Sequence, residues 1–168
     1  MSHAMLRIHK ATQRSEVEQV RTLVLEYSGS LGVDLCFQDF AREMREFPGE
    51  YTPPEGSLLL AMSGEEPAGC VGLRPLEPGV CEMKRLYVRP QHRGLGLGEQ
   101  LARAVIAEAR GLGYAAMRLD TLPSMKAAIS MYWGLGFQPI APYYRNPVEG
   151  ALFFELKLSE DALFKPRS

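Results

Sequence analysis

Gln91-His92-Arg93-Gly94-Leu95-Gly96-Leu97-Gly98 is the stretch that says most about how this chain folds. It follows a β-like run, Cys81–Val88, and precedes a run of helical periodicity that begins at Glu99. A strand, a glycine-rich loop and a helix in this order expose backbone N–H groups at the positive end of the helix dipole. The stretch therefore predicts a site for a ligand that carries phosphate.

Two common phosphate loops do not fit this stretch. The dinucleotide fingerprint Gly-x-Gly-x-x-Gly differs from Gly94-x-Gly96-x-Gly98, and it belongs early in its domain, although Asp120 lies near the distance of its acidic residue. The Walker loop needs a lysine, and none follows Gly98 directly. The pattern Gln-x-x-Gly-x-Gly instead resembles motif A of the GNAT superfamily, the acyl-coenzyme-A-dependent N-acetyltransferases. A glycine-rich turn that binds nothing is the alternative.

A second stretch, Ala128–Phe137, resembles motif B of that superfamily, Ala-x-x-Leu-Tyr-x-x-x-Gly-Phe. Met131 stands at the leucine position with similar volume, and Gly136 is typical of a helix C-cap. The resemblance runs from about Ser57 to Leu158. It implies an α/β (α+β) fold of the GNAT type. Such a fold has a mixed, mostly antiparallel sheet of about seven strands, helices on both faces, and a splay between strands 4 and 5.

The composition indicates one ordinary globular domain spanning residues 1–168, in which Met1–Ala4 would be a cloning remnant. A net charge of −1 and the lack of a long apolar run argue against nucleic-acid or membrane partners. We expect a cytoplasmic protein, because no secretory signal is visible and the three cysteines do not suggest a disulfide framework. The scattered histidines predict no metal site. A homodimer is compatible with these features.

Apolar periodicity predicts an alternating order of strands and helices. Strands are predicted at Met5–Lys10, Ser57–Met62, Ala68–Arg74, Cys81–Val88, Ala115–Thr121, Phe137–Ile140 and Ala151–Leu158. Helices are predicted at Ser15–Tyr27, Phe37–Phe47, Glu99–Arg110 and Ser124–Leu135. Gly29 and Gly32 are expected to end the first helix.

The resemblance also implies the co-substrate, acetyl-coenzyme A. The loop amides would cradle its pyrophosphate, and its pantetheine arm would pair with the fourth strand while the Leu86 N–H holds the thioester carbonyl. Relatives carry asparagine seven residues before the motif B tyrosine, where this chain has Met125, so we expect Ser124 or the backbone to make that contact. The cofactor-binding residues implied in this way are Leu86, Tyr87, Val88, Arg93, Gly94, Leu95, Gly96, Leu97, Gly98, Glu99 and Ser124.

Two residues are candidates for acid–base catalysis. Glu82 stands six residues before Val88, as the base glutamate does in histone-type relatives, and period-two alternation predicts that it shares a face with Leu86. The alternative is a glutamate that is solvated or salt-bridged to Lys84 or Arg118. Tyr132 of motif B would place its hydroxyl at the coenzyme sulfur and donate to the departing thiolate. The alternative is a core tyrosine on an amphipathic helix.

The acceptor would be a primary amine of a small molecule or peptide, attacking directly in a ternary complex. Tyr143, Tyr144 and Arg145 could hold a carboxylate or an aromatic ring, or could form a hairpin loop packed for stability. An Arg145 that faces the pocket would favour an acidic amine, such as an amino acid, over a polyamine. Three glutamates expected near the pocket mouth argue the other way: Glu43, Glu46 and Glu50. A non-catalytic module that binds acyl-coenzyme A, or that contacts proteins, is the alternative function.

Overall fold

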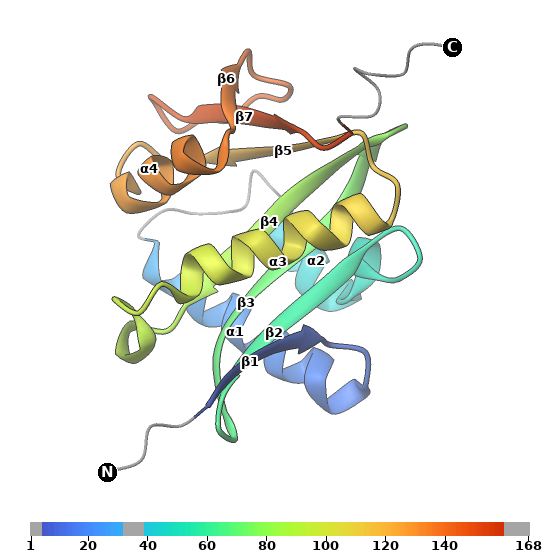
Figure 1. The fold of residues 1–168 in the computed structure, drawn as a ribbon, viewed down its shortest axis with the longest axis vertical. Helices are drawn as coiled ribbons and strands as arrows, with labels where there is room; N and C mark the ends of the chain where they lie inside the picture. Colours follow the sequence, from blue (N-terminus) through green and yellow to red (C-terminus); the bar gives the residue numbers. More distant parts are fainter. Residues whose placement is uncertain (1–4, 32–38, 160–168) are drawn as a thin grey trace.

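The computed structural model describes residues 5–31 and 39–159. Within these ranges the backbone forms one seven-stranded sheet (Figure 1). Its strands are β1 (Leu6–Lys10), β2 (Ser57–Ser63), β3 (Glu66–Glu77), β4 (Val80–Val88), β5 (Ala116–Thr121), β6 (Gln138–Ile140) and β7 (Leu152–Lys157). The helices are α1 (Arg14–Ser30), α2 (Phe40–Glu46), α3 (Leu97–Gly111) and α4 (Lys126–Leu135), with 3₁₀ turns η2 (Gly49–Tyr51) and η3 (Pro90–His92).

The strand order is β1-β2-β3-β4-β5-β7-β6, and the pairing is antiparallel everywhere except between β4 and β5. That parallel ladder runs only from Val80 opposite Ala116 to Glu82 opposite Arg118. Beyond it β4 and β5 diverge, as Figure 1 shows. The mixed sheet and its splay between strands 4 and 5 confirm the predicted fold.

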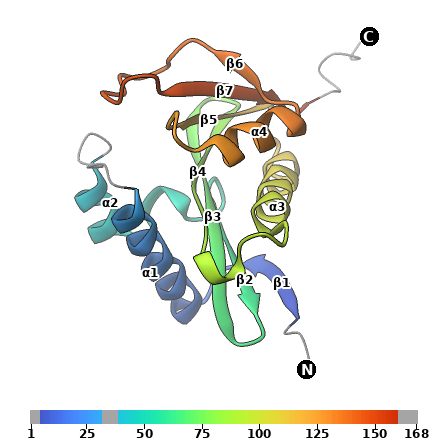
Figure 2. The ribbon, with the colours of Figure 1, turned by 90° about the vertical axis from the view of Figure 1, so that its left-hand side faces the viewer.

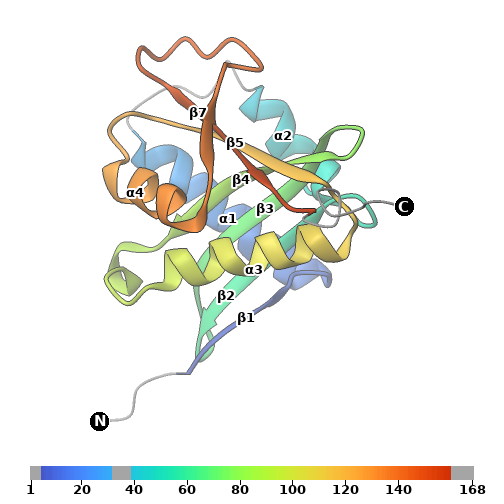
Figure 3. The same cartoon turned by 45° about the horizontal axis from the view of Figure 1, so that its top comes forward.

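Two apolar layers bury the faces of the sheet. α1 and α2 cover one face, where Leu23 and Val24 join a cluster with Leu60 and Cys70. α3 and α4 lie on the other face, and Figure 2 shows the two helix pairs on opposite sides of the sheet. In Figure 3, α3 lies in front of the strands and α1 behind them. None of the helices within residues 5–31 and 39–159 has the length and apolarity needed to cross a bilayer.

α3 shows why this sequence takes this arrangement. Its buried side chains recur at helical spacing, which places them in one stripe against β3 and β4: Leu97, Leu101, Ala102, Val105, Ile106 and Ala109. Fully burying an aliphatic side chain contributes about 1.5–3 kcal/mol. The stripe therefore fixes the start of the helix next to the end of β4, which positions the glycine-rich loop.

β4 contains a bulge that the sequence pattern did not predict. Gly72 pairs with Lys84 and Cys70 pairs with Tyr87, so the intervening part of β4 is one residue longer than that of β3. Arg85 absorbs the extra length in a left-handed conformation with φ of 62°. Leu86 consequently packs with the α3 cluster, whereas Tyr87 packs with the α1 cluster. The expectation that Glu82 and Leu86 share a face was wrong, because a bulge shifts the alternation.

The element boundaries also differ in places from the predicted ones. α1 continues through Gly29 to Ser30 because an exposed helix position tolerates glycine. β3 extends to Glu77, beyond the predicted end at Arg74. The helix predicted from Phe37 is described only from Phe40, and its first residues, like Gly32, lie outside the described ranges.

Candidate active site

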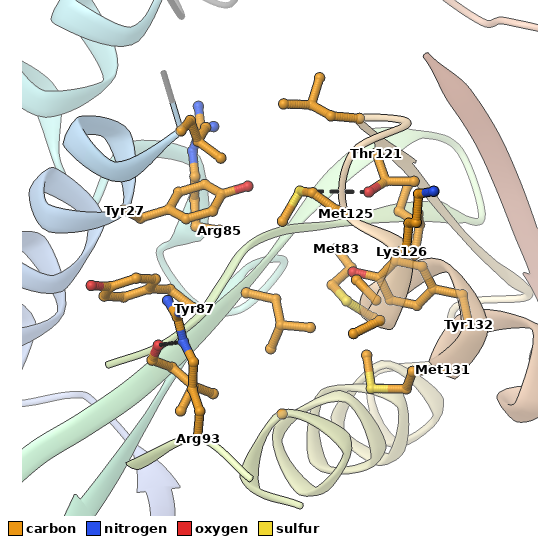
Figure 4. A pocket seen from close by; sticks show the side chains of 18 of the residues that line it. Tyr27, Met83, Arg85, Tyr87, Arg93, Thr121, Met125, Lys126, Met131 and Tyr132 are labelled. Atoms are coloured by element: carbon orange, nitrogen blue, oxygen red, sulfur yellow. Dashed lines mark hydrogen bonds between the residues drawn. The ribbon is translucent and has the colours of Figure 1, made fainter. Parts of the chain in front are cut away.

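A cavity of about 670 Å³ fills the gap between β4 and β5. Its floor and walls come from the second half of β4, the glycine-rich loop, the end of β5, and α4. The end of α1 closes one side, where Tyr27 lies against Tyr87 with ring centroids 5.7 Å apart. Figure 4 shows these tyrosines facing Met125 and Tyr132 across the open space. The splay of the sheet thus creates a cleft between β4 and β5.

The glycine-rich loop presents the start of α3 to this cavity. Gly94 and Gly96 have φ of +84° and +79°, a region that side chains rarely adopt. Gly96 is the N-cap, and no side chain caps the helix there. A Cβ atom at Gly94 or Gly96 would meet no heavy atom within 4 Å. The first N–H groups of α3 therefore lie beside open space, which suits a phosphate group.

Most of the predicted cofactor residues line this cavity. They are Leu86, Tyr87, Val88, Arg93, Gly94, Gly96, Leu97, Gly98 and Ser124. Arg93 donates from Nε to the Val88 carbonyl at 2.8 Å, which holds the loop against the end of β4. Leu95 and Glu99 are exposed and do not line it, and Glu99 pairs with Arg103 one helical turn away at 2.8 Å.

Tyr132 reaches into the cavity from α4. Its side chain is buried, with its ring edge-on to Phe137 at 5.6 Å between centroids. Among the residues that the structure describes, its hydroxyl has no hydrogen-bond partner. A buried hydroxyl without a partner is uncommon and needs a reason. Burial raises the pKa of Tyr132, so the hydroxyl keeps its proton at neutral pH and can donate a hydrogen bond to a bound group.

Glu82 does not line the cavity. Its side chain is buried, and both carboxylate oxygens are engaged. Arg74 donates from Nε to Oε1 at 3.0 Å, and the Tyr143 hydroxyl donates to Oε2 at 2.6 Å. Glu82 is thus salt-bridged, as the alternative proposed, but its partner is Arg74 and not the expected Lys84 or Arg118. A role for Glu82 as general base stays a prediction, and it would require a proton path through Tyr143.

Two tyrosines of the loop between β6 and β7 connect this loop to β4 and β5. Tyr143 bonds to Glu82 on β4, and Tyr144 donates its hydroxyl to Asp120 on β5. Both rings pack edge-on against Phe153. Arg145 is exposed, and none of the three predicted acceptor residues lines the cavity. These contacts fit the packed-loop alternative for Tyr143 and Tyr144.

Sequence reasoning missed an ion pair on the cavity wall. Lys84 on β4 and Asp120 on β5 both line the cavity, with Nζ and Oδ1 3.8 Å apart and both side chains buried. The sequence alone carried no signal for this pair, because the pairing depends on the register of β4 and β5: each residue lies two positions beyond the last pair of the parallel ladder, Glu82 opposite Arg118. Residues two apart on a strand share a face.

Arg85 is a second missed residue, and α2 holds it in place. Its Nε donates to Oε2 of Glu43 at 3.0 Å, and its Nη2 donates to Oε1 at 2.7 Å. Both side chains are buried, and the guanidinium lies 5.2 Å from the centroid of the Phe40 ring. This bidentate pair fixes the bulge residue at the cavity wall.

The splayed sheet, the glycine loop at a helix start and a buried tyrosine across the cleft define an acyl-coenzyme A binding fold. The acetyltransferase (GNAT) family matches residues 18–137, and the chain belongs to this family. It is 40% identical over 147 residues to an uncharacterized N-acetyltransferase of Schizosaccharomyces pombe, covering 86% of this chain and 90% of that protein. It is 33% identical to N-acetyltransferase 8B of Rattus norvegicus, covering 61% of this chain and 49% of that one.

Solved structures share the fold. A putative acyl-CoA N-acyltransferase from Klebsiella pneumoniae has a TM-score of 0.70 at 29% identity, covering 92% of this chain and 98% of that one. A Bacillus subtilis acetyltransferase in complex with CoA has a TM-score of 0.67 at 22% identity, covering 92% and 99%. The second likeness shows the fold alone.

Proposed function

We propose that this protein is an N-acetyltransferase that moves an acetyl group from acetyl-coenzyme A to the primary amine of a small molecule or peptide. One observation carries the proposal over a non-catalytic binding module. The cavity lined by the glycine loop is also lined by Tyr132, whose buried hydroxyl has no hydrogen-bond partner within residues 5–31 and 39–159. A module that only binds would not need a proton donor at that position. Family membership supports the same conclusion.

The residues divide the chemistry between the two ends of the cavity. Gly94, Gly96 and the start of α3 would bind the pyrophosphate, with Arg93 adding positive charge. β4 has no ladder partner in β5 beyond Glu82, so its free edge would receive the pantetheine arm. An N–H of Leu86 directed at the thioester carbonyl would stabilise the oxyanion that forms on attack, an effect worth about 3 kcal/mol.

The proton balance assigns a role to Tyr132. The amine loses one proton before its nitrogen attacks the carbonyl carbon, and a second when the C–S bond breaks and the amide forms. The second proton is needed by the departing thiolate. Tyr132 would donate toward that sulfur and recover a proton from the new ammonium or from water. A thiol with a pKa of about 8.5 is a fair leaving group, so this help is moderate.

The test is thiol release from acetyl-coenzyme A against a panel of amines that includes amino acids, polyamines, aromatic amines and peptide N-termini. Transfer to at least one class, with acetylated product detected by mass spectrometry, is the expected result. Tight binding of coenzyme A without transfer to any class would favour the non-catalytic module instead.

Replacing Tyr132 with phenylalanine should lower kcat by about tenfold to a hundredfold while the affinity for coenzyme A stays nearly unchanged. The ring and its packing on Phe137 remain, and only the hydroxyl is lost. Steady-state kinetics and calorimetric titration with coenzyme A measure the two quantities separately. An unchanged kcat would leave Tyr132 as a core residue.

Replacing Glu82 with glutamine distinguishes a structural role for its carboxylate from a role as general base. Because Arg74 and Tyr143 already engage the carboxylate, we expect lower thermal stability and a pH–rate profile of unchanged shape. Thermal unfolding and kcat measured from pH 6 to pH 10 test this. A general base would behave differently: the rate would fall most near neutral pH and recover at high pH, where the amine deprotonates by itself.

A further inference from the structure

The Lys84–Asp120 pair lies at the vertex of the splay. The last ladder pair below it is Glu82 opposite Arg118, so the next residues on the same face of each strand are Lys84 and Asp120. The two strands can no longer bond to each other at this level, and the pair bridges them. An acyl group lying between β4 and β5 would end beside this pair.

The pair lies on the side of the sheet that α1 and α2 cover, which we call the acceptor side of the cleft. Glu82, on the same face of β4, bonds to Arg74 and to the β6–β7 loop, while Leu86 and Val88 beyond the bulge pack with the α3 cluster. The coenzyme-binding loop leads into α3, which lies on the opposite side of the sheet from α1 and α2. Lys84 and Asp120 therefore face the half of the cleft that the coenzyme would leave open.

Charge on the cavity wall favours an acceptor with a negative group. The charged side chains that line it are Lys84, Arg85, Arg93 and Lys126 against the single carboxylate of Asp120, within the described residues. Arg93 lies at the glycine loop, and Arg85 is neutralised by Glu43. Lys84 and Asp120 remain as a buried dipole on the acceptor side. A purely cationic acceptor would bring excess positive charge next to a buried ammonium, which is costly.

We propose that Lys84 and Asp120 form a subsite for an amino acid or a close derivative, with the substrate carboxylate on Lys84 and its amino group on Asp120. A zwitterion bound in this orientation places its carboxylate beside the Lys84 ammonium and its ammonium beside the Asp120 carboxylate. It adds no net charge to the cavity. This proposal rests on the proposed acetyl transfer: the amino group held at Asp120 would lie beside the end of the thioester, where it would be acetylated.

Asp120 has the capacity for this contact. Its Oδ2 accepts from the Tyr144 hydroxyl and from Asn146 Nδ2, the latter at 3.0 Å. A carboxylate offers about four acceptor positions, and the 3.8 Å to Lys84 is longer than a hydrogen bond. The two loop residues orient the carboxylate, which leaves Oδ1 available to an ammonium. Burial lowers the pKa of Lys84, with the charges of Glu82 and Asp120 opposing the shift, so a bound carboxylate would also favour its protonated form.

Matched probes test the subsite on the intact protein. Each of three sets keeps one side chain and compares the amino acid with its amide and with the amine that lacks the carboxyl group. The sets are L-alanine, L-alaninamide and ethylamine; L-leucine, L-leucinamide and 3-methylbutylamine; and L-phenylalanine, L-phenylalaninamide and 2-phenylethylamine. Binding to protein saturated with coenzyme A is measured by calorimetry, and thiol release is measured with acetyl-coenzyme A. We expect the amino acid to bind roughly tenfold to a hundredfold more tightly than its amide or amine in at least one set.

Two variants localise the effect. Lys84→Met should reduce the affinity for the amino acid to that for its amide and leave the amide within about threefold of its original affinity. Lys126→Met removes another lysine from the cavity wall, on the coenzyme side, and should keep the preference for the carboxylate. If Lys84→Met does not fold, the comparison among probes on the unaltered protein decides the matter.

The outcomes separate this inference from the proposed function. Amino-acid binding with the expected preference but without thiol release supports the subsite and counts against acetyl transfer. Thiol release with equal use of acid, amide and amine supports the transfer and overturns the subsite. A preference for polyamines, or no binding of any trio member to the coenzyme-loaded protein, overturns the subsite as well.

Discussion

Gly96→Val should weaken coenzyme A binding by roughly a hundredfold or more, since several backbone N–H bonds to phosphate would be lost together. Gly96 has φ of +79° and ends the loop as the N-cap of α3. Its Cβ position meets no protein atom within 4 Å and faces the cavity, so the new side chain would occupy space that the phosphate needs. Calorimetry with coenzyme A gives the affinity directly.

Strain alone would also reduce affinity if the loop changed shape, so a matched glycine is needed as control. Gly79 has the same φ of +79° and equally open surroundings, but it lies in the β3–β4 turn away from the cavity. Gly79→Val should lose a similar amount of stability, roughly 1–3 kcal/mol, and should bind coenzyme A normally. Equal binding by the two variants would contradict the phosphate-loop interpretation.

Glu43→Gln should destabilise the protein by about 3–5 kcal/mol, because it removes one partner of a buried, bidentate ion pair with Arg85. The pair is bidentate, and Glu43 also accepts the Tyr51 hydroxyl at 3.0 Å. Urea unfolding at pH 7 measures the loss. Glu46→Gln on the same helix is the control: its partner Arg42 is exposed, so the expected change is below about 0.5 kcal/mol. Similar losses in both variants would contradict the assignment.

The same pair predicts a pH dependence. Burial by itself would raise the pKa of Glu43, but the hydrogen bonds and charge of Arg85 outweigh burial and bring it below the ordinary value of 4.5. A carboxyl with a lowered pKa contributes stability that is complete above its unfolded value and is lost as the pH falls through its folded value. Stability should therefore drop below about pH 4.5 more steeply in the parent protein than in Glu43→Gln.

The sequence predicted those parts of the site that depend on local motifs. The glycine loop requires positive φ at fixed positions, and motif B places Tyr132 on a helix next to the β5–β7 side of the sheet, so both could be recognised without a structure. The order of strands and helices predicted a mixed sheet with helices on both faces, and the resemblance of the two motifs to the GNAT superfamily supplied the splay. These predictions needed only neighbours along the chain.

The acceptor side depends on contacts between distant segments, and there the sequence was a poorer guide. The sequence around Arg85 does not indicate a bulge, because the extra residue can be recognised only when the pairing of β4 with β3 is known. The partners of Glu82 come from β3 and from the β6–β7 loop, far away in sequence. Strict alternation along β4 therefore predicted that Glu82 and Leu86 share a face, whereas the bulge puts them on opposite faces.

The bulge at Arg85 has a consequence for engineering the enzyme. Because one extra residue shifts the alternation, Lys84 before the bulge lies on the opposite face of β4 from Leu86 and Val88 after it, which pack with the α3 cluster. If the proposed subsite is correct, substitution of Lys84 should change acceptor choice while the proposed coenzyme contacts at Leu86 and Val88 stay constant. A library built on β4 should accordingly vary position 84 together with position 120 and keep the length of the strand fixed, since deleting one residue would interchange the two sets of side chains.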